Sequence, residues 1–163
     1  MADVQAHNIV PHSFHSAPYV EVRQSFRSQI QAISPFIEQL MRFILKFRST
    51  DDSDEDIETA LREALANAVT HGNGQDSARH VHVVCRCYID GEVWITVRDE
   101  GRGFDINTVP DPTEPRNRLL SHGRGIYLMQ KLMDQVFFEG SGTIVHLRKN
   151  SNAICAEQGR TGS

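Results

Sequence analysis

Residues 81–98, VHVVCRCYIDGEVWITVR, have the pattern of two strands joined by a tight turn. Side chains alternate along residues 81–89, so the apolar ones fall on one face: Val81, Val83, Cys85, Cys87 and Ile89. Asp90-Gly91 is a favoured hairpin turn, and residues 92–98 repeat the alternation with Val93, Ile95 and Val97. The stretch therefore predicts an antiparallel hairpin with one buried face.

The segments on either side of the hairpin predict helices and further strands. Upstream, residues 19–25 alternate like an edge strand. Apolar residues then recur at every third or fourth position over residues 28–47, which predicts an amphipathic helix. Pro35 could mark its start, with Ser34 as the N-cap, in which case the helix spans residues 35–47. An acidic loop over residues 48–56 leads into a second helix over residues 54–71. Downstream we expect an irregular loop (106–121), a helix (125–135) and two strands (136–139 and 143–149).

The order of these elements predicts the fold class. Strands occur in antiparallel pairs with helices between the pairs, instead of one helix after each strand. We therefore expect an α+β fold: a two-layer α/β sandwich with a mixed, mostly antiparallel sheet and its helices on one face. A doubly wound fold is not expected because the βαβ alternation is missing.

Composition places limits on the kind of protein. A chain of 163 residues is enough for one domain, which we expect over residues 17–150 between a flexible leader (1–16) and a flexible tail (151–163). The net charge of −4 and pI near 6.0 give no sequence-wide basic footprint for nucleic acid or a membrane surface. The start does not resemble a signal peptide, and no apolar run approaches the roughly 20 residues that span a bilayer. We expect a soluble, cytoplasmic protein.

Cysteines and histidines indicate no metal or disulfide framework. The three cysteines (Cys85, Cys87 and Cys155) suggest a reducing compartment, and the strand pair is interpreted as small apolar core residues. The leader holds His7, His12 and His15, but zinc needs a fourth ligand and a rigid frame, so a flexible segment is expected.

Glu63 and Asn67 lie one helical turn apart in EALANAVTHGN (63–73). They are about 40° apart on a helical wheel and point away from the expected core stripe of Ile57, Leu61, Ala64, Leu65 and Ala68. An Asn carbonyl oxygen is a suitable hard ligand for Mg²⁺, and a Glu carboxylate can accept a proton from a hydroxyl or a water. Taken alone, each residue is more often an ordinary surface side chain, with Glu63 paired to Arg62 or His71.

Two glycine loops follow. In DEGRGFD (99–105), Asp99 at a strand end could accept a hydrogen bond from an exocyclic amine such as that of adenine, while Gly101 and Gly103 allow a ring or a phosphate to approach; a plain turn is the alternative. Gly123-Arg124-Gly125 opens a helix and so suits an anion, with Arg124 either adding charge or facing solvent. Neither the dinucleotide fingerprint nor a P-loop is present.

Together the three motifs favour ATP. The Glu63–Asn67 pair suits the metal, the Asp99 loop the base and the Gly123 loop the phosphates. The proline-rich segment between the loops could close as a lid, and its Arg116 and Arg118 could reach the phosphates or remain solvated.

The motifs resemble those of the GHKL ATPases, the superfamily of gyrase, Hsp90, sensor histidine kinases and MutL. Residues 63–73 are similar to the N box, residues 99–105 to the G1 box, and HGRGIYLMQKLMDQV (122–136) to the G2 box. The short length and the closing GTIVHLRK (142–149) more closely resemble the anti-sigma-factor serine kinases of the RsbW and SpoIIAB type. The resemblance covers residues 18–149.

The resemblance implies a Bergerat-type sandwich that binds ATP with Mg²⁺. By motif match, Asn67 would ligate Mg²⁺, Glu63 would act as base toward the incoming hydroxyl, and Asp99 would read adenine. Other residues would line the nucleotide pocket: Gly101, Gly103, Gly123, Arg124 and Gly125. Thr143 matches a threonine that approaches the base beside Asp99.

The resemblance also implies partners. Such proteins hold a sigma factor, phosphorylate a serine or threonine of a small STAS-type antagonist, and form homodimers without direct contact to nucleic acid or membrane. Partner-facing surface is expected on residues 35–47 and around the lid. No phosphoacceptor-histidine helix precedes the N box, which argues against a complete sensor histidine kinase. The alternative is a nucleotide-gated switch without phosphotransfer; Glu63 favours the kinase because binding alone needs no base.

Overall fold

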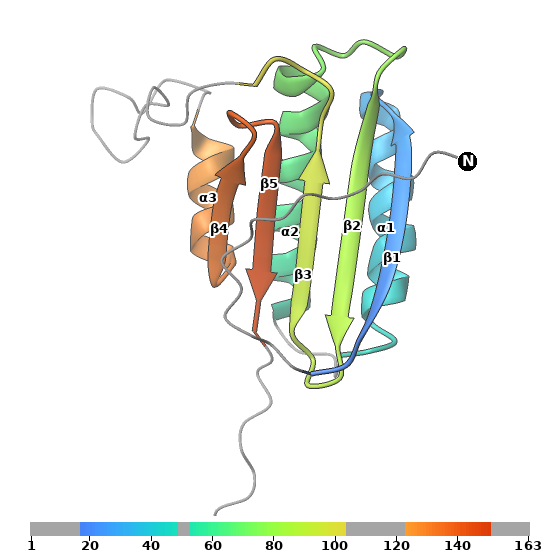
Figure 1. Cartoon of the computed structure of the whole chain (residues 1–163), viewed down its shortest axis with the longest axis vertical. Helices are drawn as coiled ribbons and strands as arrows, with labels where there is room; N and C mark the ends of the chain where they lie inside the picture. Colours follow the sequence, from blue (N-terminus) through green and yellow to red (C-terminus); the bar gives the residue numbers. More distant parts are fainter. Residues whose placement is uncertain (1–16, 49–52, 104–122, 151–163) are drawn as a thin grey trace, which may run out of the picture.

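The protein forms two layers, a sheet and a set of helices on one of its faces (Figure 1). The computed structural model describes residues 17–48, 53–103 and 123–150. The strands are β1 (Tyr19–Arg27), β2 (His80–Tyr88), β3 (Val93–Arg98), β4 (Gln135–Glu139) and β5 (Ile144–Lys149). The helices are η1 (Ile30–Ala32, 3₁₀), α1 (Ile33–Ile44), α2 (Ser53–Asn67), η2 (Ala68–Gly72, π) and α3 (Arg124–Leu132).

The expected fold class is confirmed. The five-stranded sheet has the order β1-β2-β3-β5-β4, and every pairing between these described strands is antiparallel. The hairpin predicted from residues 81–98 is present, with Val83 opposite Val97 and Cys85 opposite Ile95. Because the period along a strand is two, this register turns the apolar side chains of both strands toward the helices.

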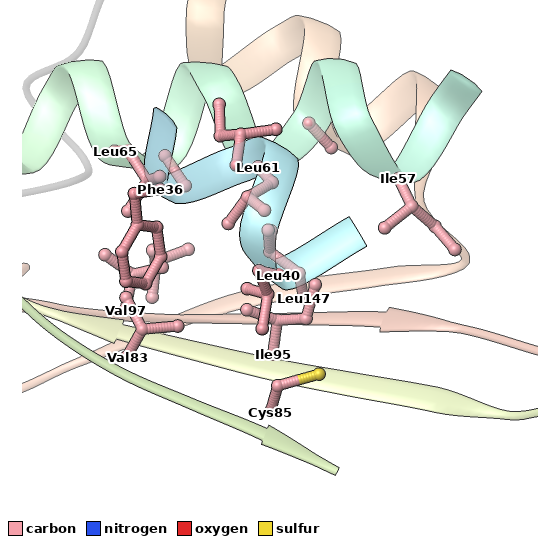
Figure 2. Packing of buried hydrophobic residues seen from close by; sticks show 14 of the residues in the cluster. Phe36, Leu40, Ile57, Leu61, Leu65, Val83, Cys85, Ile95, Val97 and Leu147 are labelled. Carbon is pink, nitrogen blue, oxygen red and sulfur yellow. The ribbon is translucent and has the colours of Figure 1, made fainter. Parts of the chain in front are cut away.

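The core lies between the sheet and α2. Ile57, Leu61 and Leu65 are fully buried, and Figure 2 shows them facing the side chains that rise from the sheet. Each such side chain stabilises the fold by about 1.5–3 kcal/mol relative to an exposed one. Cys85 and Cys87 are buried in the same cluster, as expected for small apolar core residues.

Helix α1 corrects one prediction. It begins at Ile33 and ends at Ile44 instead of spanning residues 35–47, and its N-cap is Ala32, with no side-chain cap hydrogen bond. Pro35 is tolerated inside the first turn because backbone N–H groups there have no partner within the helix. Ser34, predicted as the cap, instead accepts a hydrogen bond from Arg62 Nη1 at 3.0 Å.

Ile89 corrects a second prediction. It was expected on the buried face of its strand, but β2 ends at Tyr88 and the Ile89 side chain is 78% exposed. The backbone N–H of Ile89 bonds to the Pro18 carbonyl at 3.0 Å. The turn therefore begins one residue earlier than the alternation suggested.

Helix α2 ends in a π turn. The predicted helix over residues 54–71 is observed as α2 followed by η2, after which the Asn73 N–H bonds to the Ala68 carbonyl at 2.8 Å. Turns of this kind are frequent at functional sites because they widen the helix and redirect the residues that follow.

Several expectations fall outside the described residues: the three leader histidines, Cys155, Arg116, Arg118 and the whole proline-rich loop over residues 106–121. Within the described ranges, no helix combines the length and apolar character needed to cross a membrane. The same ranges contain no group of three or more His, Cys, Asp or Glu side chains arranged to hold a metal ion.

Candidate functional site

The predicted site residues gather at one pole of the molecule. The C-terminal end of α2, the end of β3, the start of α3 and the turn between β4 and β5 all lie at the upper end in Figure 1. These segments are far apart in the sequence, and packing of the helices onto the sheet brings them together.

Glu63 and Asn67 face the start of α3 across Gly125. A Cβ atom added to Gly125 would lie 2.6 Å from Glu63 Oε2 and 3.4 Å from Asn67 Nδ2. A glycine is therefore required for the first turn of α3 to approach these side chains this closely. The motif at 63–73 and the motif at 122–136 form one site.

The side chains of Glu63 and Asn67 are available to a ligand. Glu63 and Asn67 are half-buried, and neither forms a hydrogen bond or an ion pair with any described residue. Arg62, the alternative neighbour for Glu63, pairs instead with Glu58 at 3.0 Å and bonds to Ser34. The Glu63 carboxylate and the Asn67 amide thus lie against the start of α3, and no described residue occupies their hydrogen-bonding atoms.

Asp99 is the second centre of the site. Its side chain is 9% exposed, Oδ1 accepts a hydrogen bond from the Gly101 N–H at 2.8 Å, and no described residue donates to Oδ2. Burial raises the pKa of the Asp99 carboxyl, although the Gly101 N–H and the charges of Arg79 and Arg98 oppose that shift. The Asp99 Oδ2 atom is therefore an acceptor that a ligand with a hydrogen-bond donor could use.

Gly72 forms the wall against which the Asp99 carboxylate packs. A Cβ at Gly72 would lie 2.3 Å from Asp99 Cγ, and a Cβ at Gly101 would lie 1.9 Å from the Gly72 carbonyl oxygen. The backbone that leaves η2 therefore runs in contact with the glycine loop after β3. This contact connects the end of η2, five residues after Asn67, to Asp99.

The turn between β4 and β5 lies beside Asp99. The Asp99 N–H bonds to the Thr143 carbonyl at 3.0 Å, while the Thr143 hydroxyl donates to the Gly140 carbonyl at 2.8 Å. Gly103 adopts a φ of 76°, and a Cβ there would lie 2.0 Å from the Ser141 carbonyl oxygen. Thr143 is thus adjacent to Asp99 as expected from the motif match, and its role toward a base stays a prediction.

The start of α3 has the geometry of an anion site. Gly123 is its N-cap with a left-handed φ of 92°, and the next residue, Arg124, is exposed. The first backbone N–H groups of a helix carry partial positive charge and lack partners within it. Gly125 lies against Glu63 and Asn67, and the role of Gly123, Arg124 and Gly125 toward phosphates stays a prediction.

Sequence reasoning missed two residues of this pole, Asn73 and Glu100. Asn73 is 2% exposed and accepts a hydrogen bond from the Glu100 N–H through Oδ1 at 2.8 Å. The only signal in the sequence was the turn-like HGNG, which stops a helix but does not say what the Asn side chain touches.

Comparison with known proteins identifies the family of the chain. The family described as "Histidine kinase-like ATPase domain" matches residues 26–149. The "Anti-sigma F factor" of Heyndrickxia coagulans is 35% identical over 121 residues, covering 69% of this chain and 82% of that protein. The anti-sigma F factor of Priestia megaterium is 33% identical over 123 residues with the same coverage. The chain belongs to the histidine kinase-like ATPase domain family.

Within this ATPase family, a solved structure shows the same fold. The crystal structure of the RsbU and RsbW domains of a Mycobacterium tuberculosis protein superposes with a TM-score of 0.58 at 22% identity. The match covers 80% of this chain and 32% of that longer one. The two chains therefore share a fold at low sequence identity.

Proposed function

We propose that this single ATPase domain binds ATP at the pole described above and transfers its terminal phosphoryl group to a serine or threonine of a small partner protein. The observation that carries the proposal is the pairing of Glu63 and Asn67, both without a described protein partner, against the glycine at the start of α3. A site for nucleotide binding alone would need Asn67 and the loops but no carboxylate beside them.

Each part of ATP has a matching group. The Asp99 Oδ2 atom would accept a hydrogen bond from the exocyclic amine of adenine, and backbone N–H groups at the start of α3 would bind phosphate oxygens. The amide oxygen of Asn67 fits Mg²⁺ because it is a hard oxygen donor that no described residue occupies. When bound, Mg²⁺ would neutralise phosphate charge.

Glu63 is proposed as the general base. Its carboxylate would accept the proton of the incoming hydroxyl while Gly125 keeps the start of α3, and the phosphates bound to it, within reach. In phosphoryl transfer the protein forms few covalent bonds itself. Positioning of the reactants by these backbone groups therefore supplies most of the rate acceleration.

The names of the relatives suggest the partner proteins. Because the curated relatives are named anti-sigma F factors, we extend the proposal to an anti-sigma factor that captures a sigma factor and phosphorylates its STAS-type antagonist. A homodimer in the cytoplasm, with no direct contact to nucleic acid or membrane, completes the proposed assembly.

A transfer experiment tests the proposal. The full chain would be incubated with labelled ATP, Mg²⁺ and candidate antagonists from its own genome, beside the variants Glu63→Gln and Asn67→Ala. We expect Glu63→Gln to lower transfer by about 100-fold or more with ATP affinity nearly unchanged, because Gln keeps the shape but cannot act as a base. Asn67→Ala should lose the Mg²⁺-dependent part of ATP binding.

Glu55→Gln is the matched control, since it removes an exposed carboxylate from the same helix. It should leave both transfer and binding unchanged. ATP binding without transfer to any antagonist would support the nucleotide-gated switch instead of the kinase. Absence of ATP binding would reject the site itself.

A further inference from the structure

Asn73 joins three segments that meet around the Asp99 loop. Its side chain donates from Nδ2 to the His80 carbonyl at 2.9 Å and accepts at Oδ1 from the Glu100 N–H at 2.8 Å. Its own N–H bonds to the Ala68 carbonyl at 2.8 Å. One buried side chain therefore connects the end of η2, the start of β2 and the loop after β3.

Glu100 closes a ring of hydrogen bonds with these groups. Its Oε2 atom accepts from the His80 N–H at 2.9 Å, and Oε1 lies 2.9 Å from His82 Nε2. Asn73, His80 and Glu100 are thus each bonded to the other two. Hydrogen bonds arranged in a connected network position their members more firmly than the same bonds made separately.

The ring adjoins the residues that surround the Asp99 carboxylate. Gly72, whose backbone abuts that carboxylate, directly precedes Asn73, and Asp99 directly precedes Glu100. The bond between Asn73 Oδ1 and the Glu100 N–H therefore holds together the two backbones between which the Asp99 side chain lies. Without it, the Gly72 wall and the Asp99 loop could move apart.

We propose that Asn73 is a positioning residue for base recognition: its amide oxygen holds the Glu100 N–H and so sets the direction in which Asp99 Oδ2 meets the exocyclic amine of a purine. The inference rests on the proposed nucleotide site. An amide is suited to the position because one planar group supplies both the donor for the His80 carbonyl and the acceptor for the Glu100 N–H.

The test compares ATP with purine riboside triphosphate, which lacks only the 6-amino group. Dissociation constants of the full chain for both nucleotides would be measured at pH 8, together with thermal unfolding of each variant. We expect the wild type to prefer ATP by about 10–100-fold, the value of one hydrogen bond to a charged acceptor. In Asn73→Ala the preference should fall to within about threefold, because phosphate contacts bind both nucleotides alike.

Asn73→Asp separates positioning from stability. It keeps the acceptor for the Glu100 N–H but cannot donate to the His80 carbonyl, so it should unfold at a lower temperature yet retain most of the preference for ATP. Asn73→Ser, whose hydroxyl is too short to bridge both groups, replaces the alanine variant if that variant does not fold.

Two results would overturn the inference in different ways. If Asn73→Ala retains the wild-type preference, or if the preference falls equally in Asn73→Asp, Asn73 is only structural and the base site stands. If the wild type binds both nucleotides equally, the proposed base site fails and the Asn73 inference fails with it.

Discussion

Asp99, the proposed acceptor for the base, opposes the stability of the unliganded fold. Burial raises the pKa of its carboxyl above the ordinary value, so the folded chain holds the proton more tightly than the unfolded chain. The stabilising contribution is therefore complete below the unfolded pKa and is lost as the pH rises through the folded value. At neutral pH the ionised carboxylate lowers the free energy of unfolding.

We therefore expect Asp99→Asn to raise the melting temperature of the nucleotide-free protein at pH 7 and to lower ATP affinity by about 10–100-fold. Asn keeps an oxygen acceptor for the Gly101 N–H but is neutral. Unfolding scans at pH 7 and pH 4 check the first part, since the difference between variant and wild type should shrink at the lower pH. A variant less stable than the wild type at pH 7 would contradict the argument.

Gly125 separates stability from activity in another way. Replacing a helical glycine with alanine favours the helix by roughly 0.5–1 kcal/mol, but the new Cβ would lie 2.6 Å from Glu63 Oε2. The carboxylate can shift, because it is the far end of a flexible side chain, so the fold tolerates the change while the base moves.

Gly125→Ala should thus unfold at the same or a slightly higher temperature and transfer phosphate at least about 10-fold more slowly. Gln130→Ala, at an exposed position of the same helix, is the control and should leave transfer unchanged. Loss of folding in Gly125→Ala, or full activity, would show that the close approach to Glu63 is not as described.

Among the elements, the β4–β5 hairpin holds a buried histidine on the open face of the sheet. His146 is stacked on Phe137 with ring centroids 4.5 Å apart, bonds through Nδ1 to Thr96 Oγ1 at 2.9 Å, and has Glu139 Oε2 3.3 Å from Nε2. Burial lowers the pKa of His146, and the nearby Glu139 carboxylate only partly offsets this shift. The hairpin is thus built around a neutral imidazole.

A histidine whose pKa is lowered by folding contributes stability above its unfolded pKa, near 6.5, and loses it as the pH falls through the folded value. The free energy of unfolding should accordingly decrease from pH 7 to pH 5. Urea titrations at both pH values should show a smaller decrease in His146→Gln, which cannot be protonated in this range. Equal decreases in variant and wild type would exclude His146 as a source of the pH dependence.

At the scale of the whole molecule, the side chains of Arg48 and Lys149 connect the segments that meet at the pole opposite the candidate site. The Arg48 side chain bonds to the Gly91 carbonyl, reaches Ser53 Oγ at 2.5 Å and lies 3.4 Å from Asp54 Oδ1. It thereby links the end of α1, the β2–β3 turn and the start of α2. Lys149 Nζ adds a bond to Asp56 Oδ2 at 2.9 Å. Asp54 and Asp56, both in the first turn of α2, accept these contacts.

Removing Arg48 should destabilise the fold without touching the nucleotide site. Arg48→Met leaves Asp54 buried without this cation, which typically costs about 3–5 kcal/mol, and should lower the melting temperature by roughly 10 °C. At temperatures below the melting temperature of the variant, its ATP affinity should stay within about threefold of that of the wild type. Arg42→Met, at an exposed site on α1, should change stability by less than about 0.5 kcal/mol. A large loss of ATP affinity in Arg48→Met would mean that the two poles are coupled.

Local pattern was enough for the hairpin of residues 81–98, for helix α2 and for placing Glu63 and Asn67 on one face, since each depends only on neighbours within a few residues. It was not enough where packing overrides a local preference. Helix α1 begins at Ile33, not after Ser34, because Ile33 is buried against the core. Ile89 extends the strand alternation but lies in the turn.

The approach of Gly125 to Glu63, of Gly72 to Asp99 and of Asn73 to Glu100 followed only from the folded chain. Such contacts depend on how the helices pack on the sheet and on the register of the strands. Both are determined by many weak packing interactions over the whole core. The sequence therefore identifies the residues suited to bind a nucleotide, whereas only the tertiary structure brings them close together.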